Sequence, residues 1–89
     1  MSEIDVQIVN RLGLHARAAA RLVHVANRFT CHITISKEGS RVDGKSILGL
    51  LTLAASKGTR LKLSAVGEDE QEALSELAQL IRDRFGEDE

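Results

Sequence analysis

The feature that most restricts the fold of this chain is a repeated change in the spacing of its hydrophobic residues. Near the N-terminus, Ile4, Val6 and Ile8 alternate with polar residues, as expected of a strand with one buried face. Between Ala19 and Phe29, apolar residues recur at intervals of three and four, as in an amphipathic helix. The same change occurs again further along, so the sequence predicts strands and helices in alternation around one sheet.

The predicted order of elements is βαββαβα, without an internal repeat or a linker. The strands are expected at 3–9, 30–36, 40–43 and 59–66, and the helices at 16–28, from 46 up to Lys57-Gly58, and from 69 to a stop at Gly86. One sheet with all helices on a single face, in the split βαβ manner, is the economical arrangement. Right-handed crossovers then place the last strand between the first and the second.

The two later helices carry specific local predictions. Ser46 is the expected N-cap of the short helix. The residues of this helix that we expect in the core are Ile47, Leu50, Leu51 and Ala54. Leu48 and Leu53 fall outside that stripe. In the last helix, Asp69 and Glu72 have the spacing of a capping box. Its apolar stripe comprises Leu74, Leu77, Ala78, Ile81 and Phe85. Residues 87–89 are predicted to form a frayed acidic tail.

Composition narrows the class of protein. Residues 1–89 are the length of one domain, and with two Phe and no Trp or Tyr the core must be built from Val, Ile, Leu and Ala. We therefore expect no deep cofactor cavity and no cofactor. The lone Cys31 excludes an intramolecular disulfide and a thiolate metal cluster, and His24 and His32 lack a metal-ligand arrangement. With no signal peptide or membrane-spanning segment in the sequence, we expect a cytoplasmic monomer that does not insert into membranes.

Charge is distributed unevenly along the chain. Residues 1–62 carry ten Lys or Arg and four Asp or Glu, whereas residues 63–89 carry two and nine. The basic part favours acidic partner proteins or phosphate. Nucleic acid is not an expected partner, because stacking aromatic residues are nearly absent and no binding signature is present.

The candidate chemical site lies where the first strand meets the first helix. A short loop, Asn10 to Leu14, delivers His15 to the first helical turn. Unpaired backbone N–H groups at a helix start can hold a phosphate, and here they belong to Ala16, Arg17 and Ala18. Imidazole is a nucleophile near neutral pH, and the Arg17 guanidinium can pair with phosphate oxygens. These groups together suggest a phosphoryl relay.

Three segments carry a resemblance to a known family. The run from Val9 to Ala19, VNRLGLHARAA, resembles the active-site segment of the histidine-containing phosphocarrier (HPr) family of the bacterial phosphoenolpyruvate-dependent phosphotransferase system. Residues 44–50, GKSILGL, are similar to its regulatory serine segment, and residues 64–70, SAVGEDE, to the entry of its last helix. One departure is Ala18, where the family usually has proline. The resemblance implies an α+β open-faced β-sandwich of four antiparallel strands and three helices.

The resemblance also implies a function. Nδ1 of His15 would accept a phosphoryl group from Enzyme I, which is charged by phosphoenolpyruvate, and pass it to a histidine of an Enzyme IIA component in sugar uptake. Arg17 would stabilise the transferred phosphate. Such a protein is a carrier that is consumed and regenerated, not an enzyme. An HPr kinase/phosphorylase would phosphorylate Ser46; the alternative is that Ser46 is only a helix cap.

Candidate docking residues follow from the same pattern. A basic row continues from the histidine along the first helix through Arg17, Arg21, His24 and Arg28. Apolar candidates in the short helix are Ile47, Leu48 and Leu51. The alternatives are an ordinary solvated face and a surface leucine without a role.

Two rival functions remain. In the first, the chain is a regulatory binding module, either a nitrogen-branch or a non-transport HPr homologue, that controls a kinase or transcription regulator through its phosphorylation state. The second, a small acyl-phosphate hydrolase, lacks the Gly-rich phosphate loop with arginine and asparagine that it would need.

Overall fold

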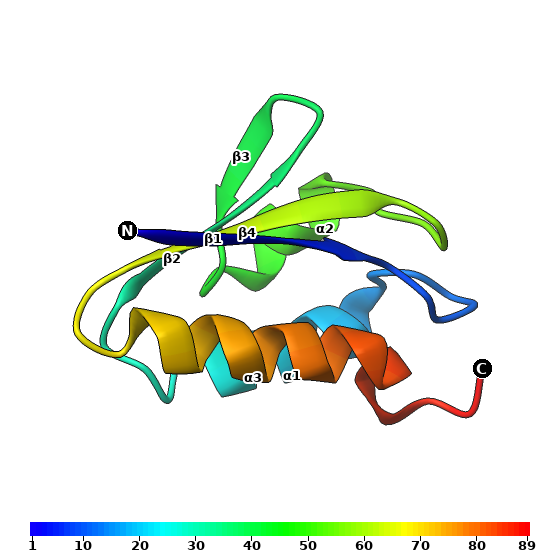
Figure 1. Ribbon diagram of the computed structural model, residues 1–89. Coiled ribbons are helices and arrows are strands. Elements are labelled where there is room, and N and C mark those ends of the chain that lie inside the picture. The colour runs from blue at the N-terminus through cyan, green and yellow to red at the C-terminus, as the bar shows by residue number, and fades with distance from the viewer.

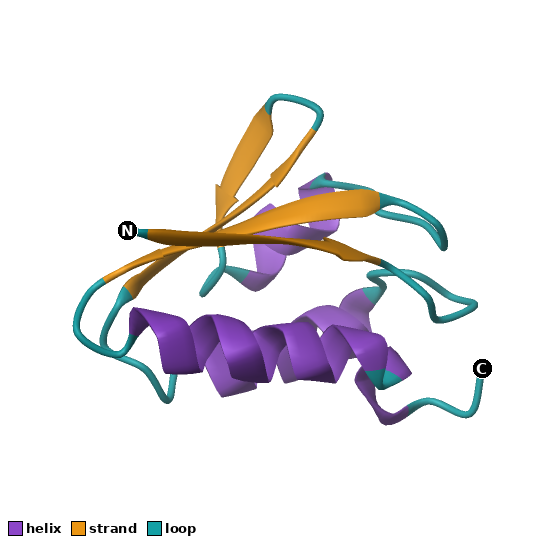
Figure 2. Ribbon diagram, in the orientation of Figure 1, coloured by secondary structure: helices purple, strands orange, loops and turns teal.

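The structure is a computed structural model that describes residues 1–89, and it has two layers, a sheet and a set of helices (Figures 1 and 2). The strands are β1 (Ser2–Gln7), β2 (His32–Lys37), β3 (Ser40–Asp43) and β4 (Arg60–Val66). The helices are α1 (Ala16–Ala26), α2 (Ile47–Thr52), α3 (Glu70–Arg82) and the short 3₁₀ turn η1 (Arg84–Gly86). The predicted order is confirmed.

The sheet is antiparallel throughout, in the order β1-β4-β2-β3. β4 therefore lies between β1 and β2, as the crossover rule predicts. Leu63 of β4 is the register partner of both Ile4 and Ile35, and Ile35 is also the partner of Val42. One row of apolar side chains thus crosses all four strands on the face that packs against the helices, because side chains on register partners share a face.

Helices α1 and α3 lie next to each other beneath the sheet, and α2 packs against α1 and β3 (Figure 1). Twenty-four buried hydrophobic residues form one core. The stripe predicted for the first helix is buried as expected, and α1 contributes Ala18, Ala19, Leu22, Val23 and Ala26. Helix α1 ends at Ala26, two residues before the predicted end at Arg28.

The predicted core stripe of α2 is partly wrong. Leu50 is buried, but Ile47 and Leu51 are 41% and 37% exposed and Ala54 is exposed. Leu53, predicted to lie outside the stripe, is buried. The helix ends at Thr52, so the helical period does not continue to residues 53 and 54, and the chain turns Leu53 inward as it leaves the helix.

The predicted capping box at the start of α3 is also wrong. The Asp69 side chain makes no capping hydrogen bond. Its carboxylate accepts hydrogen bonds from the backbone N–H groups of Thr30 and Cys31, at 2.8 and 3.0 Å, and so ties the entry of β2 to the entry of α3. Glu70, not Glu72, accepts the backbone N–H of Gly67, at 3.1 Å.

The C-terminal segment departs most from the prediction. Helix α3 ends at Arg82, four residues before Gly86, and Phe85 reaches the core from η1. Residues 87–89 are not a frayed tail. They lie against the loop between β1 and α1, where Glu89 pairs with Arg11 at 2.9 Å (Figure 1). The backbone N–H of Arg11 also donates to the carbonyl of Glu89, and Asn10 donates to the Glu87 carboxylate, so the tail is joined to this loop by hydrogen bonds as well as by an exposed ion pair.

Candidate functional site

The loop between β1 and α1 places the candidate histidine. Leu14 N–H donates to the carbonyl of Ala55 at 2.8 Å, so the loop is fastened to the segment after α2. Gly13 adopts a φ of +70°, and a Cβ atom there would lie 2.6 Å from the Ala55 oxygen. Only glycine fits this conformation at this distance. The loop thereby brings His15 to the start of α1.

His15 is the N-cap residue of α1, with extended backbone angles (φ −81°, ψ 179°). Its Nδ1 accepts a hydrogen bond of 3.3 Å from the backbone N–H of Arg17. The side chain is 29% exposed, so the ring is accessible from solvent. The imidazole therefore faces the amide donors of the first helical turn, as the sequence predicts.

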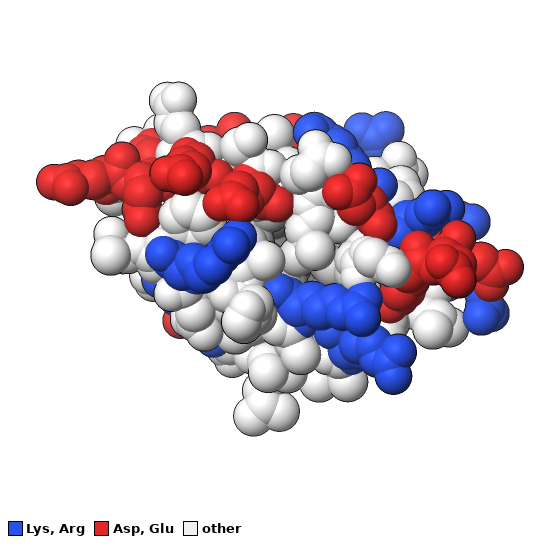
Figure 3. All heavy atoms as spheres, turned by 90° about the horizontal axis from the view of Figure 1, so that it is seen from below, with Lys and Arg blue, Asp and Glu red and all other residues white.

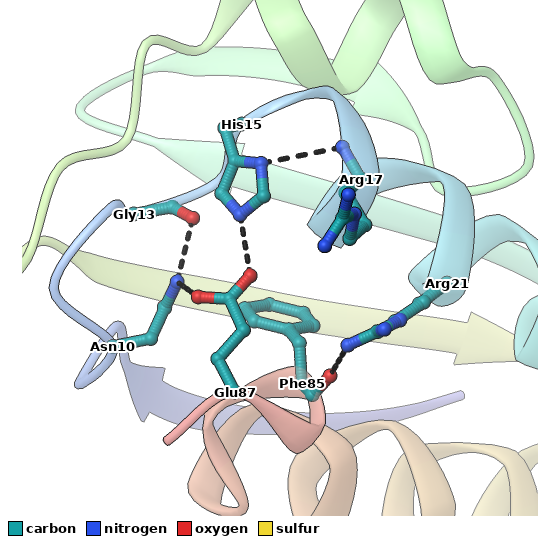
Figure 4. Close-up of polar contacts among 7 residues, drawn as sticks. All are labelled: Asn10, Gly13, His15, Arg17, Arg21, Phe85 and Glu87. Carbon is teal, nitrogen blue, oxygen red and sulfur yellow. Dashed lines mark hydrogen bonds and ion pairs between the residues drawn. The ribbon is translucent and has the colours of Figure 1, made fainter. Parts of the chain in front are cut away.

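The other ring nitrogen, Nε2, contacts Oε2 of Glu87 (Figure 4). Oε1 of Glu87 accepts a hydrogen bond of 2.9 Å from Asn10 Nδ2, which also donates to the Gly13 carbonyl at 2.8 Å. Asn10 is fully buried. Sequence reasoning missed both Asn10 and Glu87 as residues of the site.

Electrostatics around Glu87 favour its ionised form. Burial by itself would raise the pKa of Glu87, but the hydrogen bonds from Asn10 and His15, the charge of the His15 ring when it is protonated and the charge of Arg21 outweigh it. The pKa therefore lies below the usual value of 4.5, and Glu87 is a carboxylate at neutral pH.

An open pocket of about 760 Å³ lies at the histidine. Its walls are formed by Arg11, Leu12, His15, Ala16, Arg17, Glu87, Asp88 and Glu89. Arg17 is exposed, and its guanidinium makes no hydrogen bond within the protein, so this cation is available to an incoming anion. Ala16 is exposed in the same turn, whereas the Ala18 side chain is fully buried.

The basic row along α1 is exposed, but two of its members have partners inside the molecule. Arg28 pairs with Glu76 of α3 at 2.9 Å, and Arg21 donates to the carbonyl of Phe85. Arg17 and His24 have no such partner. In Figure 3, which views the helix layer, a row of carboxylates runs along one edge, and basic side chains lie beside it and across the middle of the face. A further cluster of carboxylates lies beside basic side chains at one end.

The prediction that Ser46 caps a helix is confirmed. Its hydroxyl oxygen accepts the backbone N–H of Gly49 at 3.0 Å, at the N-terminus of α2. Leu48 is 78% exposed in the same helix. The residues of α2 named as docking candidates thus all reach the surface.

No cluster of three or more His, Cys, Asp or Glu side chains has the geometry to bind a metal ion. None of the helices combines the length and apolar character that crossing a bilayer requires.

A family model described as the "PTS HPr component phosphorylation site" matches residues 2–83. This chain belongs to the HPr family of phosphotransferase-system phosphocarriers. The Phosphocarrier protein HPr of Pseudomonas aeruginosa is 50% identical over the full length of both chains. The HPr-like protein Crh of Bacillus subtilis is 47% identical over 93% of this chain and 98% of its own. Sugar transport is the known role of the family, and its HPr members are phosphocarriers.

Solved structures of HPr proteins have the same fold as this chain. The crystal structure of HPr-C-His from Thermoanaerobacter tengcongensis matches with a TM-score of 0.96 at 44% identity, over 100% of each chain. A crystal structure described as an HPr dimer from the same organism matches with a TM-score of 0.79 at 45% identity, over 98% of this chain and 100% of that one. The predicted open-faced sandwich is therefore confirmed.

Proposed function

We propose that His15 is the residue that carries the phosphoryl group, accepting it from phospho-Enzyme I and passing it to a histidine of an Enzyme IIA component. The observation that supports this most strongly is the position of the ring, accessible at the N-cap of α1 with Nδ1 facing the backbone N–H of Arg17. A helix start is an anion site, and here it lies beside a nucleophilic nitrogen.

The transfer step uses groups already in place. The lone pair of His15 Nδ1 attacks phosphorus, the P–N bond of the donor histidine breaks, and its electron pair returns to the donor's imidazole. Because the hydrogen bond from the Arg17 N–H occupies the Nδ1 lone pair in the free protein, it must break before the attack. The N–H then donates to a phosphate oxygen, and the free Arg17 guanidinium pairs with another. Ala16 and Ala18 supply the other backbone donors of the first turn. Transfer to the acceptor is the same step in reverse.

Docking residues are proposed on the exposed surface next to this site. Arg21 and His24 on α1, and Arg28 just beyond its end, extend the basic row. Apolar contacts on α2 are offered by Ile47, Leu48 and Leu51. Small, transient interfaces with acidic partner surfaces fit a carrier that must bind and leave repeatedly. A cytoplasmic location and a monomeric state are part of this proposal. A related structure is described as a dimer, so the monomeric state needs its own test, which is sedimentation of the free protein.

The experiment is to incubate the protein with Enzyme I and labelled phosphoenolpyruvate and to map the acid-labile phosphate. We expect one phosphate, located on His15 and absent from the His15→Ala variant. His32→Ala, which removes an exposed strand histidine, is the control and should be charged like the wild type. A His15→Ala variant that is still charged would contradict the proposal.

A second function is regulatory. Ser46 is proposed as a phosphorylation site for an HPr kinase/phosphorylase, because a phosphate there would sit at the N-terminus of α2. The alternative, which Ala18 leaves open, is a purely regulatory role in which the charged protein controls a kinase or transcription regulator; one relative, at 47% identity, is the HPr-like protein Crh. Adding an Enzyme IIA component to the charged protein separates the two roles, because only a carrier loses its phosphate to it.

A further inference from the structure

The transfer step proposed above uses Nδ1 of His15, whereas the contact with Glu87 is made by the other ring nitrogen, Nε2. Both hydrogen bonds of the Asn10 amide are donated by Nδ2 to oxygens, one of them Oε1 of Glu87. The buried amide therefore holds the carboxylate in place, and Oε2 is left facing Nε2 of the ring (Figure 4). The Glu87 side chain, which is only 16% exposed, is therefore pre-positioned by Asn10 rather than free in solvent.

The charge of Glu87 determines which ring nitrogen bears the proton. An ionised carboxylate only accepts hydrogen bonds, so the ring must present Nε2–H to it. A neutral imidazole has one N–H, and Nδ1 then keeps its lone pair. The position of Nδ1 agrees, because it accepts the Arg17 N–H at 3.3 Å.

We propose, building on the proposed function, that Glu87 is a positioning residue that holds His15 in the Nε2–H tautomer and so keeps Nδ1 ready to attack phosphorus. When Nδ1 forms its bond to phosphorus and the P–N bond of the donor breaks, no proton leaves Nε2. The carboxylate then balances the positive charge that develops on the ring. A ring that keeps this proton is also the better leaving group when the phosphoryl group moves on.

The first test uses the free protein and needs no phosphoryl donor. Long-range ¹H–¹⁵N spectra of the ¹⁵N-labelled protein at pH 8 report the tautomer of each histidine ring. We expect the Nε2–H form of His15 to predominate in the wild type. In Glu87→Ala, the ratio of the Nε2–H to the Nδ1–H tautomer should fall about tenfold, since a charge-assisted hydrogen bond is lost. Glu87→Gln keeps an oxygen acceptor and should restore most of the ratio.

The second test measures the rate of charging by phospho-Enzyme I. We expect Glu87→Ala to lower kcat/KM about tenfold, with Glu87→Gln in between. The control is Glu72→Ala, which removes an exposed carboxylate of α3 that makes no hydrogen bond or ion pair. The rings of His24 and His32 are internal controls for the spectra.

The outcomes separate the two proposals. An unchanged tautomer ratio in Glu87→Ala would overturn the positioning role, and so would a changed ratio with an unchanged rate of charging. If the wild type shows the expected tautomer but accepts no phosphate on His15, the proposed function fails, while the effect of Glu87 on the ring stands.

Discussion

At the scale of single residues, Gly13 is a position where the structure allows no side chain. Its φ is +70°, and a Cβ atom would meet the Ala55 carbonyl oxygen at 2.6 Å. We predict that Gly13→Ala lowers the free energy of unfolding by at least about 2 kcal/mol, because backbone strain adds to the overlap. Urea denaturation followed by circular dichroism measures it.

The matched control is Gly39→Ala, in the turn between β2 and β3. Gly39 also has a positive φ, +88°, but a Cβ atom there would meet nothing within 4 Å. Its cost should therefore be backbone strain alone, about 1 kcal/mol. Equal losses of stability in the two variants would show that the approach of Gly13 to Ala55 is unimportant.

Ala18, where the family usually has proline, is a second residue with a testable role. Proline is tolerated in the first turn of a helix but lacks the N–H. We predict that Ala18→Pro still carries phosphate, with a phosphohistidine lifetime shortened about two- to tenfold by the loss of one donor. The measurement is the decay of labelled phosphate at neutral pH. Ala18→Gly, which keeps the N–H, is the comparison, and an unchanged lifetime in Ala18→Pro would count against the role of this donor.

Single residues also show the limit of the sequence reasoning about the site. His15 and Arg17 could be placed because a strand pattern, a loop with glycine and a helix pattern follow one another within a short stretch. Asn10 and Glu87 could not, because they are 77 residues apart and their contact depends on where the chain turns after α3. The one signal in the sequence was the opposite charge of residues 1–62 and 63–89, which favours contact between the acidic end and the basic part.

At the scale of elements, the cap of α2 gives a prediction for Ser46. Its hydroxyl accepts the Gly49 N–H, so Ser46→Ala should lower the free energy of unfolding by about 1 kcal/mol. Ser46→Asp should stay within about 0.5 kcal/mol of the wild type, because aspartate caps equally well. Its negative charge should nonetheless slow charging by Enzyme I, since α2 packs against the basic helix α1. A Ser46→Asp variant charged as fast as the wild type would contradict the regulatory proposal.

Asp69, which links the entry of β2 to that of α3, predicts a pH dependence of stability. The hydrogen bond from the Thr30 N–H is the main cause that lowers the pKa of Asp69 from 3.8; burial opposes it, and bonds from Cys31 assist. Because the pKa is lower in the folded state, its contribution is present above the unfolded pKa and is lost as the pH falls through the folded one.

We therefore expect Asp69→Asn to be less stable than the wild type at pH 7, and the difference to shrink as the pH falls below about 4. Thermal unfolding of both proteins over a series of pH values measures this. A difference that is constant with pH would mean that the charge of Asp69 contributes nothing.

Elements differ in how well the sequence predicts them. Long strands and helices with a clear period were found, and the sheet order followed from crossover handedness. The buried face of α2 was predicted wrongly. This helix has only six residues, fewer than two turns, so the spacing of its apolar residues does not define which face is buried. The capping box at Asp69 failed because a tertiary partner, the backbone of Thr30 and Cys31, took the carboxylate that the local pattern assigned to the helix.

At the scale of the whole molecule, the two differently charged parts of the chain meet at the candidate site. Residues 1–62 supply Arg11, His15 and Arg17, and residues 63–89 supply the tail carboxylates that line the same pocket. The acidic partner surface that we propose would therefore compete with this tail for the basic groups. The fold thus brings together, at one end, the histidine, a free guanidinium and a carboxylate that faces the ring.

The most direct test of the account is whether Nδ1 of His15 forms the bond to phosphorus. The protein labelled with ¹⁵N-histidine is charged by Enzyme I and phosphoenolpyruvate, and its ³¹P signal is examined for coupling to nitrogen. The account predicts one phosphorus signal, coupled to Nδ1 of His15. A phosphate on Nε2, on another residue, or no phosphate at all would contradict it.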